Sequence, residues 1–163
     1  MTDFRTLLEV LVDSEVEFVI VGGLAATVHG SARLTQDIDV VYARSEANLE
    51  RLANSLERLA PYPRGAPPGL PFEWSAATLR RGLNFTLTTT GGYIDLLGEI
   101  TGGGGYEDLL PHTLEIELFG HRCLCLELDW LIRTKRAAGR PRDFETVAEL
   151  LVLREERDTS GTH

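Results

Sequence analysis

Hydrophobic residues recur along the chain with two different periods, and these periods predict its helices and strands. Apolar side chains return every three or four positions over residues 3–13 and 46–59, which is typical of amphipathic helices. Short runs rich in β-branched residues at 18–21 and 37–41 predict buried strands. The same patterns predict the remaining elements, which are strands at 84–89, 93–97, 114–118 and 123–128 and helices at 24–29, 75–81, 129–138 and about 141–155.

Glycine and proline mark the segments between these elements. Residues 61–71 hold five of the seven prolines and predict a surface loop. The run Gly102–Gly105 predicts a mobile connector. Helices and strands mix without a regular βαβ series, so we predict an α+β fold with a central mixed β-sheet flanked by helices. We expect one domain over residues 1–157, with C-terminal helices from about 129, and a flexible tail at 158–163.

Composition narrows the classes of function. The chain has 25 acidic and 16 basic residues and a net charge of -9, which disfavours non-specific binding to a phosphate backbone. Cys123 and Cys125 lie two apart in an apolar run, so in a strand they face the same side and are expected to be buried thiols. The N-terminus lacks a signal peptide, and no apolar run reaches membrane-spanning length. We therefore expect a cytoplasmic protein without membrane contact.

Three aspartates carry the candidate chemistry. Asp37 and Asp39 alternate with apolar residues in a predicted strand, so both carboxylates project from one face. Asp95 lies in another apolar strand, where a lone acid is costly unless it meets a positive charge. If the two strands are neighbours, the three carboxylates converge. Such oxygen ligands favour Mg²⁺, or Mn²⁺ in its place, bound together with substrate phosphates.

A diglycine, Gly22-Gly23, follows the first predicted strand. Glycines at a strand-to-helix junction let backbone N–H groups approach a phosphate closely. Each feature alone has an ordinary explanation, because many Asp-x-Asp pairs are solvated and many diglycines are simple turns. The combination, in this order and spacing, favours a phosphoryl-transfer site.

These residues resemble the motifs of the nucleotidyltransferase superfamily that includes DNA polymerase β. The family pattern is a diglycine or Gly-Ser at a helix start, then Asp-x-Asp, then a third acid on a later strand. Gly22, Gly23, Asp37, Asp39 and Asp95 match it in that order. The resemblance covers roughly residues 15–150 and implies a nucleotidyltransferase-type fold. It also implies that the three aspartates are catalytic metal ligands and that the two glycines bind nucleotide.

The surrounding residues look similar to the small prokaryotic branches related to AbiEii-type toxins and the minimal MNT proteins. The similarity is carried by His29-Gly30, Arg33, Thr35 and residues 131–143. It implies metal-dependent transfer of a nucleoside monophosphate from a nucleoside triphosphate, with release of pyrophosphate. It does not fix the acceptor, because family members modify tRNA, proteins or small drugs; RNA, tRNA or protein is the acceptor expected here. It also suggests a toxin–antitoxin setting with a cognate partner. The alternative is a non-catalytic nucleotide-binding or antitoxin-like module with the same fold.

Basic residues near the predicted site have two interpretations each. Lys135 is the chain's only lysine, and the resemblance favours it as a phosphate contact within the basic stretch 133–142. The other arginines of that stretch either form an electropositive wall or belong to a solvated helix face. Arg33 precedes the aspartate pair and either binds phosphate or forms a salt bridge that orients Asp37 or Asp39. Thr35, in the same loop, is expected to face the nucleotide.

Overall fold

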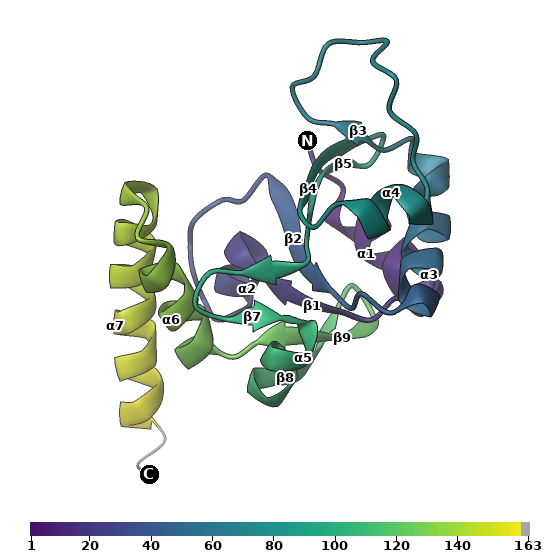
Figure 1. Cartoon of the computed structure of the whole chain (residues 1–163). Coiled ribbons are helices and arrows are strands. Elements are labelled where there is room, and N and C mark those ends of the chain that lie inside the picture. Colours follow the sequence, from purple (N-terminus) through teal and green to yellow (C-terminus); the bar gives the residue numbers. More distant parts are fainter. Residues whose placement is uncertain (161–163) are drawn as a thin grey trace.

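A seven-stranded mixed β-sheet runs through the centre of the protein (Figure 1). The structure is a computed structural model and describes residues 1–160. In spatial order the strands are β3 (Tyr62–Pro63), β4 (Phe85–Thr89), β5 (Gly92–Leu97), β2 (Asp37–Tyr42), β1 (Phe18–Val21), β9 (His121–Leu126) and β8 (Thr113–Leu118). A separate pair consists of β6 (Glu99–Ile100) and β7 (Gly104–Gly105).

Two parallel pairings at the middle of the sheet determine where the polar residues meet. Strand β2 runs parallel to β5, and β1 runs parallel to β9. The other strand pairs are antiparallel. All four residues of β1 are buried, as expected for a central strand covered on both faces. The predicted fold class, an α+β fold with a mixed sheet, flanking helices and C-terminal helices, is confirmed.

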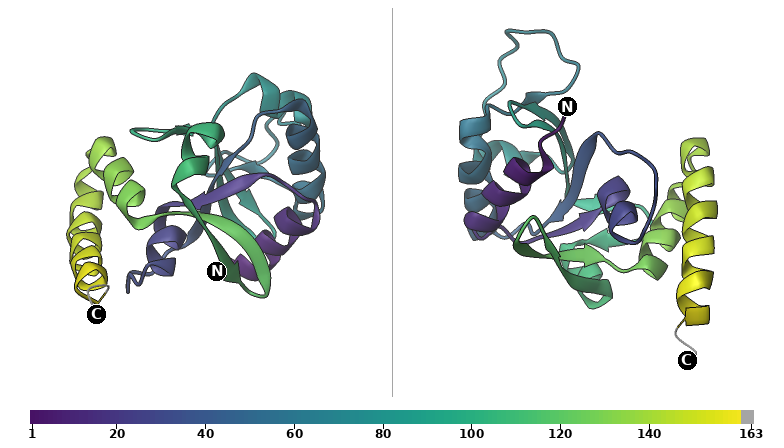
Figure 2. Two further views of the ribbon diagram at one scale, coloured as in Figure 1. Left: turned by 90° about the horizontal axis from the view of Figure 1, so that it is seen from below. Right: turned by 180° about the vertical axis from the view of Figure 1, so that it is seen from behind.

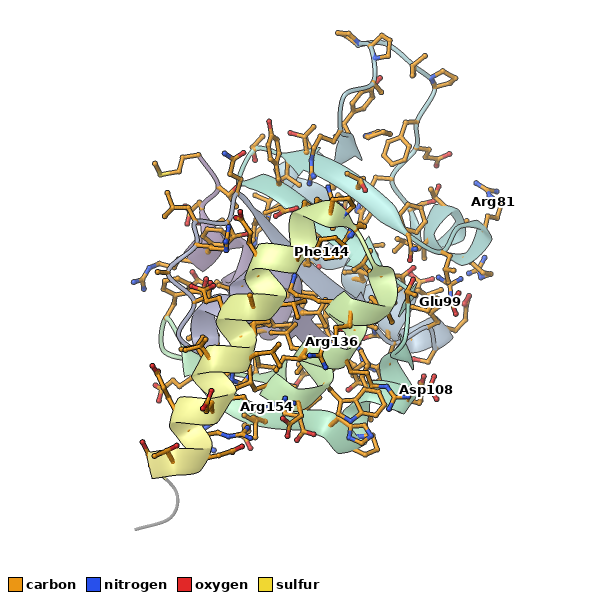
Figure 3. All side chains as sticks on the ribbon, turned by 90° about the vertical axis from the view of Figure 1, so that its left-hand side faces the viewer. Arg81, Glu99, Asp108, Arg136, Phe144 and Arg154 are labelled. Carbon is orange, nitrogen blue, oxygen red and sulfur yellow. The ribbon has the colours of Figure 1, made fainter. Side chains whose placement is uncertain are left out.

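Most of the described helices lie in two groups on opposite sides of the molecule (Figures 1 and 2). In both figures α1, α3 and α4 lie together at one side, while α6 and α7 stand at the other. Figure 3 looks onto this second side, where α7 carries the labelled Phe144 and Arg154. The helices are α1 (Phe4–Asp13), α2 (Gly22–Val28), α3 (Glu46–Leu56), α4 (Ala76–Arg81), α5 (Tyr106–Leu109), α6 (Leu128–Ala138) and α7 (Phe144–Ser160).

Local sequence signals explain the helix starts and the core-facing sides. The side chain of Asp3 accepts a hydrogen bond from Thr6 N and caps α1, and Ser45 caps α3 in the same way. The apolar side of α1 places Leu7 and Leu11 in the core with no exposed area. Helix α1 packs on α3 and on the sheet. The amphipathic periodicity therefore predicted both helices and the faces that they bury.

The C-terminal helices begin differently from the predictions and α7 ends later, whereas α6 ends at Ala138 as expected. Helix α6 begins at Leu128 with Glu127 at its N-cap, so Asp129 lies inside the first turn and does not cap it. Pro141 begins a 3₁₀ turn (Pro141–Asp143) that leads into α7. Helix α7 continues to Ser160, so the first three residues of the predicted tail are helical; residues 161–163 lie outside the described part.

The glycine run does not form the predicted mobile connector. It contributes β7, which pairs with β6, and it packs closely against α6. A Cβ added at Gly102 would lie 2.4 Å from the Cβ of Ala137. The carboxylate of Asp108 accepts a hydrogen bond from Gly105 N at 2.9 Å. Glycine is used here for close packing as well as for turning, and composition alone does not distinguish these two uses.

The proline-rich segment forms an edge strand and a protruding loop. Strand β3 pairs only by two residues with β4 at the sheet edge, a position that tolerates proline. The chain then leaves the body of the molecule and returns to α4, which makes the loop prominent in Figure 1. The Tyr62 hydroxyl donates a hydrogen bond to Pro67 O and accepts one from Leu70 N. The predicted loop is therefore confirmed, and it is tied together at its base.

Two further expectations concern the cysteines and the membrane. Cys123 and Cys125 are free and buried on β9, as predicted from their alternation. Among residues 1–160, no helix has both the length and the apolar character needed to cross a bilayer.

Candidate active site

Three carboxylates converge where β2 and β5 lie side by side. The parallel register of these strands places Asp39 directly opposite Asp95, and Asp37 projects from the same face two residues earlier. One oxygen from each of the three carboxylates lies within 4.8 Å of the others. The convergence expected from the sequence is thus confirmed, because the two strands are neighbours.

The diglycine brings the β1–α2 bend against this cluster. Gly22 has a φ of +67°, and a Cβ added there would lie only 2.1 Å from Asp39 Oδ2. A Cβ at Gly23 would lie 2.6 Å from Thr35 Oγ1. Residues with side chains do not fit at either position without displacing a cluster residue or its neighbour. The two glycines therefore allow the backbone to approach the carboxylates closely.

The carboxylates repel one another, and the effect is largest at Asp39. Burial, together with the neighbouring charges of Asp37 and Asp95, raises the pKa of Asp39 to about 8. Burial also raises the pKa of Asp95, although the Arg64 guanidinium opposes this. Such a cluster is fully ionised at neutral pH only when positive charge lies nearby.

The donor set fits a hard divalent cation. Asp39 Oδ1 is buried and has no hydrogen-bond partner in the part of the chain that the structure describes. Oxygen ligands from one or two carboxylates, completed by waters and substrate phosphates, suit Mg²⁺ and Mn²⁺. Asp37, Asp39 and Asp95 are therefore the residues that could hold such an ion.

Arg64 is a member of the cluster that sequence reasoning missed. Its Nη2 donates to Asp95 Oδ1 at 2.8 Å, and its Nη1 lies 3.9 Å from Asp37 Oδ2. Its guanidinium lies 4.4 Å from the ring centre of Tyr93. Arg64 is the only basic residue in the stretch 61–71, but this alone does not place it near the aspartates. Only the pairing of strands that lie more than 20 residues further along the chain shows that Arg64 reaches Asp95.

A cavity of about 880 Å³ extends from the carboxylates to a basic wall. Lys135 lines this wall, with its Nζ 3.7 Å from Asp143 Oδ1. Asp143 is buried, and its other oxygen accepts a hydrogen bond from Arg140 Nε at 2.7 Å. One acid thus holds two cavity-lining cations, and Arg142 lines the cavity beside them.

The rest of the basic stretch faces elsewhere. Arg133 and Arg136 are exposed and do not line the cavity, and Figure 3 shows Arg136 on the side of the molecule that carries α7. The guanidinium of Arg133 lies 4.9 Å from the ring centre of Trp130. Within this stretch, Arg140 and Arg142 line the cavity, whereas Arg133 and Arg136 do not.

The two predicted nucleotide contacts in the loop before β2 point in different directions. Thr35 lines the cavity, and its hydroxyl donates to Asp37 O at 3.1 Å and lies 3.3 Å from Asp37 Oδ1. Arg33 points to α7, where it lies 2.9 Å from a Glu145 oxygen and 3.8 Å from a Glu149 oxygen. Its ion pairs link the loop to α7 and do not orient Asp37 or Asp39.

Comparison with known proteins finds similarity at the level of structure. No protein-family model matches the chain, and a comparison with curated proteins gives no match. A candidate nucleotidyltransferase from Thermotoga maritima superposes with a TM-score of 0.56 and 18% identity, over 90% of this chain and 89% of that one.

Two structures of the antibiotic-resistance factor ANT(2'')-Ia are also similar. One, in complex with adenylyl-2''-tobramycin, has a TM-score of 0.54 and 14% identity and covers 97% of this chain and 96% of that one. The other, a solution structure, has a TM-score of 0.53 and 15% identity and covers 96% of this chain and 89% of that one. The mixed sheet and its flanking helices therefore form a nucleotidyltransferase-type fold.

Proposed function

We propose that this protein is a metal-dependent nucleotidyltransferase, which transfers a nucleoside monophosphate from a nucleoside triphosphate to an acceptor hydroxyl. The observation that carries the proposal is the meeting of three carboxylates within 4.8 Å of one another, beneath a diglycine bend and at one end of a cavity with a basic wall. The structural similarity to nucleotidyltransferases over about nine-tenths of the chain supports it.

The carboxylates divide into two roles in this proposal. Asp37, Asp39 and Asp95 hold Mg²⁺, or Mn²⁺ in its place, which neutralises phosphate charge when bound. Asp95 also takes the proton of the acceptor hydroxyl. The hydroxyl oxygen then bonds to the α-phosphorus as the bond to pyrophosphate breaks, so that pyrophosphate leaves with the electron pair.

The cavity residues supply binding for the triphosphate. The backbone at Gly22 and Gly23 has room to approach a phosphate because neither residue carries a side chain. Lys135 provides positive charge in the same cavity, and Thr35 also lines it. Arg33 is assigned no phosphate contact here, since its guanidinium pairs with α7.

The acceptor is an RNA such as tRNA, a protein, or a small hydroxyl compound. The last class is supported by the ANT(2'')-Ia structure, whose bound molecule is an adenylylated compound and whose chain is matched over 96% of its length. A cognate toxin or antitoxin partner belongs to the same proposal, and such a partner would supply the acceptor-binding surface. The alternative is a nucleotide-binding or antitoxin-like module that does not catalyse transfer.

A label-transfer screen tests the proposal. The protein is incubated with each α-³²P-labelled nucleoside triphosphate and Mg²⁺ or Mn²⁺, together with total RNA, total protein or a panel of aminoglycosides. We expect label in one acceptor pool and its loss in the Asp39→Asn variant. The matched control is Asp129→Asn, which changes an exposed aspartate on α6 outside the cavity.

The other outcomes separate the alternatives. Calorimetric binding of a triphosphate without transfer to any acceptor would favour the non-catalytic module. Degradation of the nucleic acid without any need for a triphosphate would indicate a metal-dependent nuclease instead.

A further inference from the structure

Arg64 is held beside the carboxylates by four contacts. Its Nη2 donates at 2.8 Å both to Asp95 Oδ1 and to the backbone oxygen of Leu87. Its Nη1 faces Asp37 Oδ2 at 3.9 Å, and the ring of Tyr93 lies against the guanidinium. The Arg64 side chain is 23% exposed, and that of Asp95 is 20% exposed. An ion pair this sheltered keeps more of its Coulomb energy than a surface pair does.

The guanidinium compensates only part of the cluster. Among the ion pairs of residues 1–160, those of Arg64 reach Asp95 and Asp37 but not Asp39. Asp39 Oδ1 remains buried and without a hydrogen-bond partner in this part of the chain. One unit of positive charge therefore faces three carboxylates, and it contacts an oxygen of two of them, Asp95 Oδ1 and Asp37 Oδ2.

The position of Arg64 in the fold allows it to move. It directly follows β3, which is two residues long and lies at the edge of the sheet. The next residues enter the protruding loop seen in Figure 1, in which Gly65 and Gly69 both have positive φ and have no other atoms within 4 Å of an added Cβ. The Arg64 N–H donates to Thr86 O at 3.0 Å, so the backbone stays in place and a shift away from the cluster is one of the side chain alone.

We propose that Arg64 is a positioning residue that acts as the resident counter-ion of the three carboxylates. It holds Asp37 and Asp95 together when no divalent cation is bound, and it gives up these contacts when a divalent cation binds. This inference rests on the proposed metal site at Asp37, Asp39 and Asp95, and it adds a competing internal cation to that site.

The proposal predicts that replacing Arg64 by glutamine increases the metal affinity and decreases the stability of the metal-free protein. Metal affinity rises, because a positive charge that repels the incoming ion is removed. With full aqueous screening, the repulsion between two unit charges about 4 Å apart weakens a binding constant by about fivefold. For a divalent ion the repulsive energy doubles, so the effect becomes about thirtyfold. The metal-free protein becomes less stable, because three carboxylates then lack their counter-ion.

The test compares wild type, Arg64→Gln, Arg64→Lys and the control Arg122→Gln. Arg122 forms an exposed pair with Glu115 on the β8–β9 hairpin, and neither residue lines the cavity. Mn²⁺ binding is followed by the electron paramagnetic resonance signal of free Mn²⁺. Thermal unfolding is measured in EDTA and in Mn²⁺.

We expect Arg64→Gln to bind Mn²⁺ about fivefold to thirtyfold more tightly than wild type. It should also unfold at a lower temperature in EDTA and gain more from Mn²⁺. Arg64→Lys keeps the charge and should stay near wild-type affinity, and Arg122→Gln should match wild type in both assays.

Weaker or unchanged Mn²⁺ affinity in Arg64→Gln overturns the proposal, because a merely structural arginine or one that helps to bind the ion gives these results. If Arg64→Gln fails to fold without metal, the proposal requires that Mn²⁺ restore its folding, and failure in Mn²⁺ overturns it. Equal binding by wild type and Arg64→Gln refutes this inference alone. Absence of Mn²⁺ binding in all four proteins refutes both the inference and the proposed metal site.

Discussion

Replacing Gly22 by alanine should cost stability in two separable ways. The first is backbone strain, because the φ of +67° lies in the left-handed region, where a non-glycine residue costs about 1–2 kcal/mol. The second is a collision, because the added Cβ would lie 2.1 Å from Asp39 Oδ2. That contact falls about 1 Å short of a tolerable distance, and forced repacking of this kind costs about 1–3 kcal/mol. The sum predicts a loss of about 2–5 kcal/mol in the free energy of unfolding.

The matched control is Gly120→Ala in the β8–β9 turn. Gly120 has a φ of +81° but open space around an added Cβ, so this variant carries the strain without the collision. Urea unfolding of both variants in EDTA measures the difference directly, which we expect to be about 1–3 kcal/mol. The same collision displaces Asp39, so Gly22→Ala should also bind Mn²⁺ more weakly than Gly120→Ala does. Equal losses of unfolding free energy in the two variants would refute the reasoning about close approach.

Three further predictions concern other parts of the molecule. Asn48→Ala removes a buried amide that bonds three backbone groups and should lower the free energy of unfolding by about 2–4 kcal/mol in urea, whereas the exposed Asn54→Ala on the same helix should cost under about 0.5 kcal/mol. Asp143→Asn removes the buried acid between two cavity cations and should cost about 1–3 kcal/mol in the same assay; an unchanged midpoint would contradict this. Burial raises the pKa of Cys123 to about 11 and that of Cys125 to about 12, so the folded state favours the protonated thiols. Their contribution to stability is complete below the ordinary pKa of 9.0 and declines as the pH rises above it. Iodoacetamide should therefore label both cysteines slowly at pH 8 in the folded protein and rapidly in urea, and fast labelling of the folded protein would argue against their burial.

The parts of the fold that were predicted correctly depend on local patterns. The strand at 18–21 was placed at its observed ends because a β-branched and aromatic run stops at the diglycine. Helix α1 was placed within one residue, because its apolar positions repeat at helical spacing. The errors lie where tertiary packing overrides local preference. The glycine run became a packed β-pair against α6, although its composition resembles that of a flexible linker.

The candidate site likewise has features that local patterns predict and features that depend on tertiary packing. The side shared by Asp37 and Asp39 follows from strand alternation alone, and only the pairing of β2 with β5 had to be supplied by the structure. Arg64 could not be placed from the sequence, because its approach to Asp95 depends on the edge position of β3 and on the register of β4 and β5. Arg33 illustrates the converse. Its sequence neighbours are near the site, but its guanidinium forms ion pairs with two glutamates on α7, more than 100 residues away in the chain.

Net charge and local charge lead to different conclusions about binding in this protein. A net charge of -9 repels an extended polyanion at long range, but screening limits that effect to about 10 Å at ordinary ionic strength. Lys135, Arg140 and Arg142 line the same cavity as three carboxylates, which repel phosphate unless a cation neutralises them. A triphosphate is therefore expected to bind together with its divalent cation and poorly without it. The acidic composition thus argues against a nucleic-acid scaffold and is compatible with a nucleotide site, because the two involve charge on different length scales.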